Sequence, residues 1–205
     1  MPAMWGLFWK TSRWEIAVLT LGTIGLVTAA VVLAAWLSAV APTGPCLELV
    51  YGGATAEETS QCGAMKEFIQ LQLETTPPVV TALALLPLVA GVLLGSQLLA
   101  REIDHRTAVL SWSVVASRSR WLLRRSMPAG TLVVLIAVTV SLASTLLHAA
   151  RYPGVDIVRS FAELGQWGPI LAARGVAAFS IALLIGTGLG RSIPALLASV
   201  IVVGM

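Results

Sequence analysis

The chain alternates between long uncharged apolar runs and polar segments that hold almost all of its charge. A spanning helix needs about 20 apolar residues. Three runs reach that length without a charged side chain: 16–41, 78–100 and 128–150. A fourth run, 168–190, is interrupted near its start by Arg174, whose long side chain is expected to snorkel to the membrane interface. A fifth run, 193–205, is too short to span and is interpreted as the start of a longer helix.

Composition supports a membrane protein. Hydrophobic residues make up 57% of the 205 residues and charged residues 11%, whereas soluble domains carry about 25% charged residues. Too little polar surface is available to cover a water-soluble globule. The first run, of 26 residues, exceeds the about 7–15 apolar residues of a cleavable signal peptide. The sequence therefore predicts an all-α integral membrane protein, with about five transmembrane helices in a permease domain over residues 16–205.

The charges of the polar segments predict the orientation. Nine Lys and Arg residues lie before the first run, between the second and third, and after the fourth, and four lie on the opposite side: Lys66, Arg151, Arg159 and, at the start of the fourth run, Arg174. Because positive residues concentrate in cytoplasmic loops, the N-terminus and the loop 101–127 are expected inside the cell and the loop 42–77 outside. The expected location is the inner (plasma) membrane. A net charge of +3 divided among loops does not make a nucleic-acid surface.

Residues 1–15 combine aromatic and cationic side chains: Trp5, Phe8, Trp9, Lys10, Arg13 and Trp14. Side chains of these types favour the headgroup level of a bilayer. We expect an amphipathic helix that lies in the membrane interface. An aromatic belt at the entrance to the first span is the alternative.

The loop 42–77 contains both cysteines of the chain, Cys46 and Cys62. An oxidising exterior permits a disulfide between them, and closing a loop of about 15 residues contributes on the order of 3 kcal/mol in the chain-entropy model. Two free thiols are the alternative. Farther along the loop, apolar residues at helical spacing predict a short amphipathic helix: Met65, Phe68, Ile69 and Leu73.

Two glycine pairs occur at a spacing of four within the runs: Gly91 with Gly95, and Gly186 with Gly190. Such pairs let two membrane helices approach closely. Glycine is common in membrane helices, so the pairs fit either a helix interface or ordinary usage.

Catalytic motifs are missing from the sequence. It has no phosphate loop, no His-Glu-x-x-His and no metal-spaced Cys/His set. We therefore expect no enzyme activity, metal or cofactor in the chain itself. The spans contain no Asp or Glu, whereas carriers driven by protons or sodium usually place such groups near the midplane. Ion-coupled transport is disfavoured.

One block of the chain, 87–123, resembles a known family. The second helix runs out through Ala100-Arg-Glu-Ile-Asp-His-Arg-Thr107 and Leu110-Ser-Trp112, and Ser117-Arg-Ser-Arg-Trp121 leads into the third helix. Arg191-Ser-Ile-Pro-Ala195 follows the fourth helix. These segments are similar to those of the permease subunits of type-2 ABC exporters, also called type V. That family has six membrane helices, so the sixth and most of the fifth have no counterpart in this sequence.

The resemblance implies a half-transporter that exports a hydrophobic or amphipathic substrate, such as a drug, a lipid or a peptide-like molecule. A separate ABC ATPase subunit would bind ATP and Mg²⁺, and a second permease chain, identical or related, would complete the pathway. Residues 101–113 would form the coupling helix, with these contacts to the ATPase: Arg101, Glu102, Asp104, His105, Arg106, Thr107, Val109, Leu110 and Trp112. A solvated positive loop is the alternative for this segment. A non-transporting membrane scaffold or assembly protein is the alternative for the chain.

Overall fold

The computed structural model describes residues 2–43, 46, 62–63, 65–104, 117–154 and 166–204. The regular structure in these residues is helical: α1 Pro2–Val40, α4 Met65–Gln70, the π-helix η1 Leu71–Thr75, α5 Thr76–Asp104, α7 Arg118–Arg151, α8 Gly168–Leu189 and α9 Ser192–Gly204. Four of these helical stretches are long and apolar enough to cross a membrane, and a shorter apolar helix covers Ile193–Val203. The predicted all-α membrane class is confirmed.

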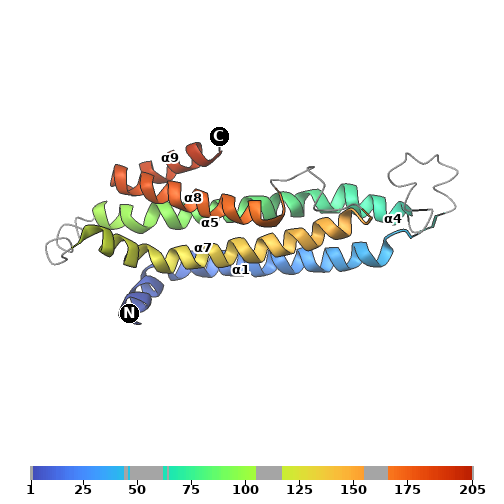
Figure 1. The fold of residues 1–205 in the computed structure, drawn as a ribbon, viewed down its shortest axis with the longest axis horizontal. Helices are drawn as coiled ribbons and strands as arrows, with labels where there is room; N and C mark the ends of the chain where they lie inside the picture. The colour runs from blue at the N-terminus through green and yellow to red at the C-terminus, as the bar shows by residue number, and fades with distance from the viewer. Residues whose placement is uncertain are drawn as a thin grey trace.

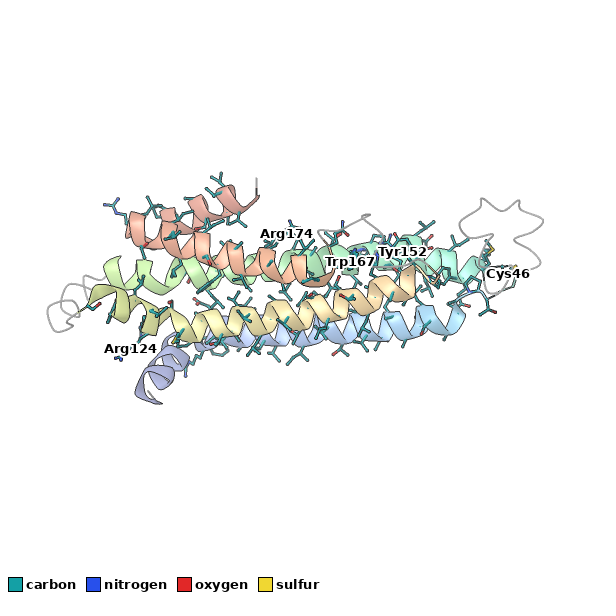
Figure 2. The ribbon with its side chains drawn as sticks, viewed as in Figure 1. Cys46, Arg124, Tyr152, Trp167 and Arg174 are labelled. Carbon is teal, nitrogen blue, oxygen red and sulfur yellow. A yellow bond between two sulfur atoms is a disulfide. The ribbon has the colours of Figure 1, made fainter. Side chains whose placement is uncertain are left out.

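The helices form an elongated bundle (Figure 1). Helices α1, α5, α7 and α8 run side by side, and α9 lies on α5 and α8. The contact between α5 and α8 is the most extensive, while α1 packs mainly against α7. We call the two ends of the bundle the loop end and the disulfide end. At the loop end α5 finishes and α7 begins, and at the disulfide end α1 finishes near Cys46, which is joined to Cys62 (Figure 2).

The bundle is apolar both inside and outside. Aliphatic side chains of α1, α5 and α7 fill the core, including Leu33, Leu83 and Val140. The outer surface carries equally apolar residues, such as Leu135 with 63% of its side chain exposed and Leu184 with 71%. Lipid tails are as apolar as leucine, so a helix in a bilayer needs no polar outer face. This pattern fits helices that face lipid.

Helix α1 runs without interruption from Pro2 to Val40, and its membrane-length part begins at Arg13. Figure 1 shows that the first turns of α1 bend away from the bundle at the loop end. Residues 2–15 are thus helical and continuous with the span. Its position in the headgroup plane of a membrane stays a prediction.

In the helix that follows Cys62, one residue of the predicted apolar face is exposed. In η1 the N–H and the hydroxyl of Thr76 both donate to the carbonyl oxygen of Leu71, the latter at 2.8 Å. A π turn holds one more residue than an α turn, so it shifts the helical phase. Phe68, before the π turn, and Leu71, at its start, are buried, whereas Leu73 within the turn is 66% exposed and does not belong to the buried face.

The helices also extend past the apolar runs at the loop end. Helix α5 continues to Asp104 and α7 begins at Arg118, so the predicted loop 101–127 is helical at both ends. Hydropathy marks where a chain leaves the bilayer, whereas helical hydrogen bonding continues until a breaking residue interrupts it. Neither 101–104 nor 118–127 contains Gly or Pro, so both segments remain helical.

Candidate functional site

The segment predicted to contact an ATPase lies at the loop end. Arg101, Glu102 and Asp104 belong to the last turn of α5. The remaining predicted contacts lie outside the described residues: His105, Arg106, Thr107, Val109, Leu110 and Trp112. Figure 1 shows the end of α5 and the start of α7 at the same end of the bundle. Both helices that flank this segment are therefore continuous with the apolar bundle.

Glycines bring the backbones of α5 and α8 into contact. A Cβ added at Gly91 would lie 2.6 Å from the carbonyl oxygen of Gly175, and one added at Gly95 would lie 2.6 Å from that of Phe179. On α8, a Cβ at Gly186 would lie 2.8 Å from the carbonyl oxygen of Ser96. Backbone atoms fill the space that a side chain would need. We call this contact between α5 and α8 the glycine seam.

Gly190 and Gly175 have structural roles that the sequence did not predict: one caps a helix and the other lies at a contact between helices. Gly190 follows the last residue of α8 with a φ of 61°, and its N–H donates to the carbonyl oxygen of Gly186 at 3.2 Å. It ends the helix as a left-handed cap. Gly175 lies in the glycine seam, because a Cβ there would lie 2.7 Å from the Cβ of Pro87. Gly175 faces Gly91 on another helix, so spacing within one helix carried no signal for it.

Two serine hydroxyls of α7 hold the start of α8. Ser141 donates to the carbonyl oxygen of Gly168 at 2.5 Å, and Ser144 donates to that of Gln166 at 2.6 Å. These serines lie ten and seven residues before the end of α7 at Arg151, which is about 15 and 10 Å along the helix. The backbone before α8 therefore reaches the level of Ser141 before the helix begins. Figure 1 shows the same offset, with α8 starting well inside the disulfide end.

Aromatic rings pack around this junction between α7 and α8. His148 stacks on Trp167 with ring centroids 4.9 Å apart, and it lies against Tyr152 at the same separation. The guanidinium of Arg151 lies 5.1 Å from the centroid of the Tyr152 ring. The side-chain amide of Gln72 donates to the carbonyl oxygen of Arg151 at 3.0 Å. These contacts join η1 to the end of α7, and Figure 2 shows Tyr152 and Trp167 in the same region.

Arg174 lies near the middle of the bundle's length (Figure 2). A Cβ added at its neighbour Gly175 would lie 3.4 Å from the Cβ of Ala137, so the two helices are level there. Ala137 is twelve residues after Arg125 and fourteen before Arg151, or about 18 and 21 Å along α7. Half of a hydrocarbon core is about 15 Å. The level of Arg174 is therefore close to the middle of the span.

Helix α5 places Arg174 at the same depth. Pro87, which also meets Gly175, is thirteen residues after Glu74 and fourteen before Arg101. Arg174 is nevertheless only six residues into α8, because α8 itself starts deep in the bundle. Arg174 therefore lies deeper along the bundle than its place near the start of α8 suggested, and its reach to the membrane interface stays a prediction. A charge at the centre of a span costs about 2.5–3.5 kcal/mol on insertion scales, and such residues usually mark a functional pathway.

The disulfide between Cys46 and Cys62 is present, with a Cα–Cα distance of 6.0 Å. The N–H of Met65 donates to the carbonyl oxygen of Cys62 at 2.9 Å. The disulfide therefore lies directly before α4 and ties the chain after α1 to the start of the next helix. Within the part of the chain that the structure describes, no three His, Cys, Asp or Glu residues gather as metal ligands.

The family follows from comparison with known proteins. A family model described as ABC-2 membrane transporter related matches residues 24–205. This range includes α5, α7 and α8 completely, together with the glycine seam and the junction between α7 and α8. No curated protein and no solved structure matches the chain significantly. The chain therefore belongs to the ABC-2 membrane transporter related family and is a multi-pass membrane protein of the ABC transporter permease type.

Proposed function

We propose that the chain is the membrane-spanning permease subunit of an ATP-driven exporter that is powered by a separate ATPase subunit. The family match over residues 24–205 carries this proposal. The membrane-length helices supply one half of a translocation pathway, and a second permease chain, identical or related, supplies the other half. The sequence has no phosphate loop, so ATP and Mg²⁺ are bound and used by the partner subunit.

The loop end is the docking side for the ATPase. In the sequence the segment 105–116 connects α5 to α7, and α7 runs for ten residues, 118–127, before its apolar run begins. Those ten residues extend about 15 Å along α7 beyond the apolar run. Charged residues of the last turn of α5 orient the partner and set the encounter rate. Trp112 supplies the aromatic anchor of the interface.

The glycine seam transmits movements of the ATPase into the membrane. Gly91 and Gly95 allow direct backbone contact between α5 and α8. Closely packed contacts of this kind have little compressibility, so a displacement at the end of α5 moves α8 with it. In contrast, α1 packs mainly against α7 and follows the movement less directly.

The orientation of the proposal places the loop end in the cytoplasm and the disulfide end outside the cell. Nine positive residues in the segments of the loop-end side, against three in the opposite segments (Lys66, Arg151 and Arg159), support this orientation. The disulfide supports it independently, because disulfides persist in oxidising compartments. The substrate is hydrophobic or amphipathic and leaves the cytoplasm.

Co-purification of the full-length protein with its candidate ATPase tests the proposal. Trp112→Ala removes a central aromatic anchor, which weakens an interface by about 2–4 kcal/mol, or about 30-fold to several hundredfold in affinity. We expect this variant to lose the ATPase or the transport activity while it still inserts into the membrane. Trp14→Ala is the matched control, because Trp14 is a 74% exposed tryptophan outside the segment.

Two outcomes would contradict different parts of the proposal. If Trp112→Ala binds the ATPase and transports like the parent chain, the segment is a solvated loop and not the coupling element. If no ATPase co-purifies with the parent chain, a membrane scaffold or assembly protein becomes the better account.

A further inference from the structure

We infer that the part of the loop end where α1 meets α7 binds an anionic phospholipid through Arg13 and Arg124. We call this region, residues 2–15 of α1 and 118–127 of α7, the α1–α7 corner. The ligand is the phosphate of a lipid with a net negative charge, such as phosphatidylglycerol. The inference rests on the membrane class of the chain and does not depend on the exporter function.

The fold concentrates positive charge at the α1–α7 corner. Residues 2–15 contain two cations and one carboxylate, Glu15, and residues 118–127 contain four arginines and no Asp or Glu. Helix α1 packs mainly against α7, and both helices begin at the loop end (Figure 1), so the two segments combine their cations around one carboxylate. Two other carboxylates of the loop end, Glu102 and Asp104, belong to the last turn of α5. Basic clusters between membrane helices bind the headgroups of anionic lipids.

Arg13 and Arg124 lie at the level of lipid headgroups. Arg13 precedes the apolar run 16–41 by three residues, and Arg124 precedes the run 128–150 by four, which is about 4.5 and 6 Å along each helix. The headgroup layer on one side of a bilayer is about 5–8 Å deep. The two arginines are therefore at nearly the same depth on two helices that pack together.

The guanidiniums of Arg13 and Arg124 are available to a ligand. Both residues are exposed, and no ion pair to either is present in the part of the chain that the structure describes. The guanidinium of Arg13 lies 5.9 Å from the centroid of the Trp14 ring, a contact that uses the face of the ring and leaves N–H donors for an anion. Figure 2 shows Arg124 beside the first turns of α1. A guanidinium can bind one phosphate with two parallel hydrogen bonds.

Apolar surface continues from both arginines toward the middle of the membrane. Val18 and Leu21 of α1 are exposed, as are Met127 and Leu135 of α7. Trp14 is exposed as well, and tryptophan is enriched at the interface between lipid and water. Cations at headgroup level beside an apolar surface fit a phosphate that carries acyl chains, whereas a free phosphate ion would contact the arginines alone. The corner therefore fits a lipid better than a soluble anion.

The stability of the purified protein tests the inference. Phosphatidylglycerol replaces phosphatidylcholine stepwise in mixed micelles with detergent, and the Tm is followed by tryptophan fluorescence. One basic residue near an anionic membrane surface contributes about fivefold in affinity. Arg13→Gln and Arg124→Gln should therefore each raise the mole fraction of phosphatidylglycerol that gives half of the stabilisation by about fivefold. Arg124→Lys should keep part of the effect, because a lysine retains the charge but not the paired hydrogen bonds.

Arg191→Gln is the matched control. Arg191 is an exposed arginine between α8 and α9, and these helices join at the loop end but outside the α1–α7 corner (Figure 1). This variant should respond to phosphatidylglycerol like the parent chain. Native mass spectrometry of the same samples counts the lipids that stay bound, and the parent chain should retain phosphatidylglycerol that the double variant of Arg13→Gln and Arg124→Gln loses.

Four results would overturn the inference. The first is a double variant that retains phosphatidylglycerol and is stabilised by it like the parent chain. The second is equal stabilisation of the parent chain by inorganic phosphate, which would identify a free anion as the ligand. The third is a double variant that binds the lipid normally but no longer co-purifies with the candidate ATPase, which would make the corner a protein interface. The fourth is a lower Tm of the variants in phosphatidylcholine alone, which would assign the arginines to the fold.

Discussion

Replacing Gly91 by alanine should destabilise the contact between α5 and α8. The new Cβ would lie 2.6 Å from the carbonyl oxygen of Gly175 and 2.8 Å from the backbone nitrogen of Phe179. Ordinary contact begins at 3.4 Å, so α8 would have to move away by about 0.8 Å. Both obstructing atoms belong to the backbone and cannot rotate aside. The whole glycine seam would therefore open rather than a single side chain.

The size of the effect follows from this displacement. A gap of about 0.5–1 Å removes about a quarter to a half of the dispersion energy of the separated atoms, and overpacking of a close contact typically costs about 1–3 kcal/mol. Alanine is intrinsically about 1 kcal/mol better than glycine in a helix, which offsets part of this loss. Gly188→Ala measures the gain in helix propensity by itself, because Gly188 lies within a helix, α8, and a Cβ there meets nothing within 4 Å.

The free energy of unfolding should be measured for both variants by titration of the detergent-solubilised protein with SDS, followed by tryptophan fluorescence. We expect Gly91→Ala to be about 1–3 kcal/mol less stable than Gly188→Ala. Equal stability of the two variants would refute the backbone contact between α5 and α8, and with it the path by which movements at the loop end reach α8.

Two further predictions concern the start of α8 and the orientation. Ser141→Ala removes the hydroxyl that donates to the carbonyl oxygen of Gly168 across the two helices and should lower the free energy of unfolding by about 0.5–1.5 kcal/mol. Ser180→Ala, at an exposed serine that donates to the carbonyl oxygen of Val176 in its own helix, should change it by less than about 0.5 kcal/mol, and equal effects would contradict the anchoring role. In a cysteine-free background, a membrane-impermeant thiol reagent applied to intact cells should label Glu58→Cys and spare Arg118→Cys, whereas the reverse pattern would invert the proposed orientation.

The spans could be predicted from the sequence because the thickness of the bilayer sets the length of each apolar run. The run 128–150 lies within α7, and the run 78–100 lies within α5. The ends of these helices were predicted less well, because the Arg-rich residues 118–127 leave the apolar region without leaving the helix. The disulfide was predictable because the loop 42–77 contains the only two cysteines.

Relations between helices could not be predicted in the same way. The depth of Arg174 depends on the two serine bonds that set where α8 starts relative to α7, and no pattern within α8 contains that information. Gly175 has its partner, Gly91, on another helix. Leu73 changed sides because of a π turn, which the spacing of apolar residues does not indicate. Most of the proposed ATPase contacts, including Trp112, lie outside the described residues.

ATP-dependent movement of an amphiphile by the purified complex tests the central claim most directly. The protein and its candidate ATPase are reconstituted together in liposomes with the ATPase outside, and uptake of labelled hydrophobic and amphipathic probes into the lumen is followed with and without ATP. The account predicts uptake of at least one probe that requires ATP, both subunits and an intact phosphate loop in the ATPase. Uptake that is the same without the ATPase, or no uptake of any probe by a complex that hydrolyses ATP, would contradict an exporter permease.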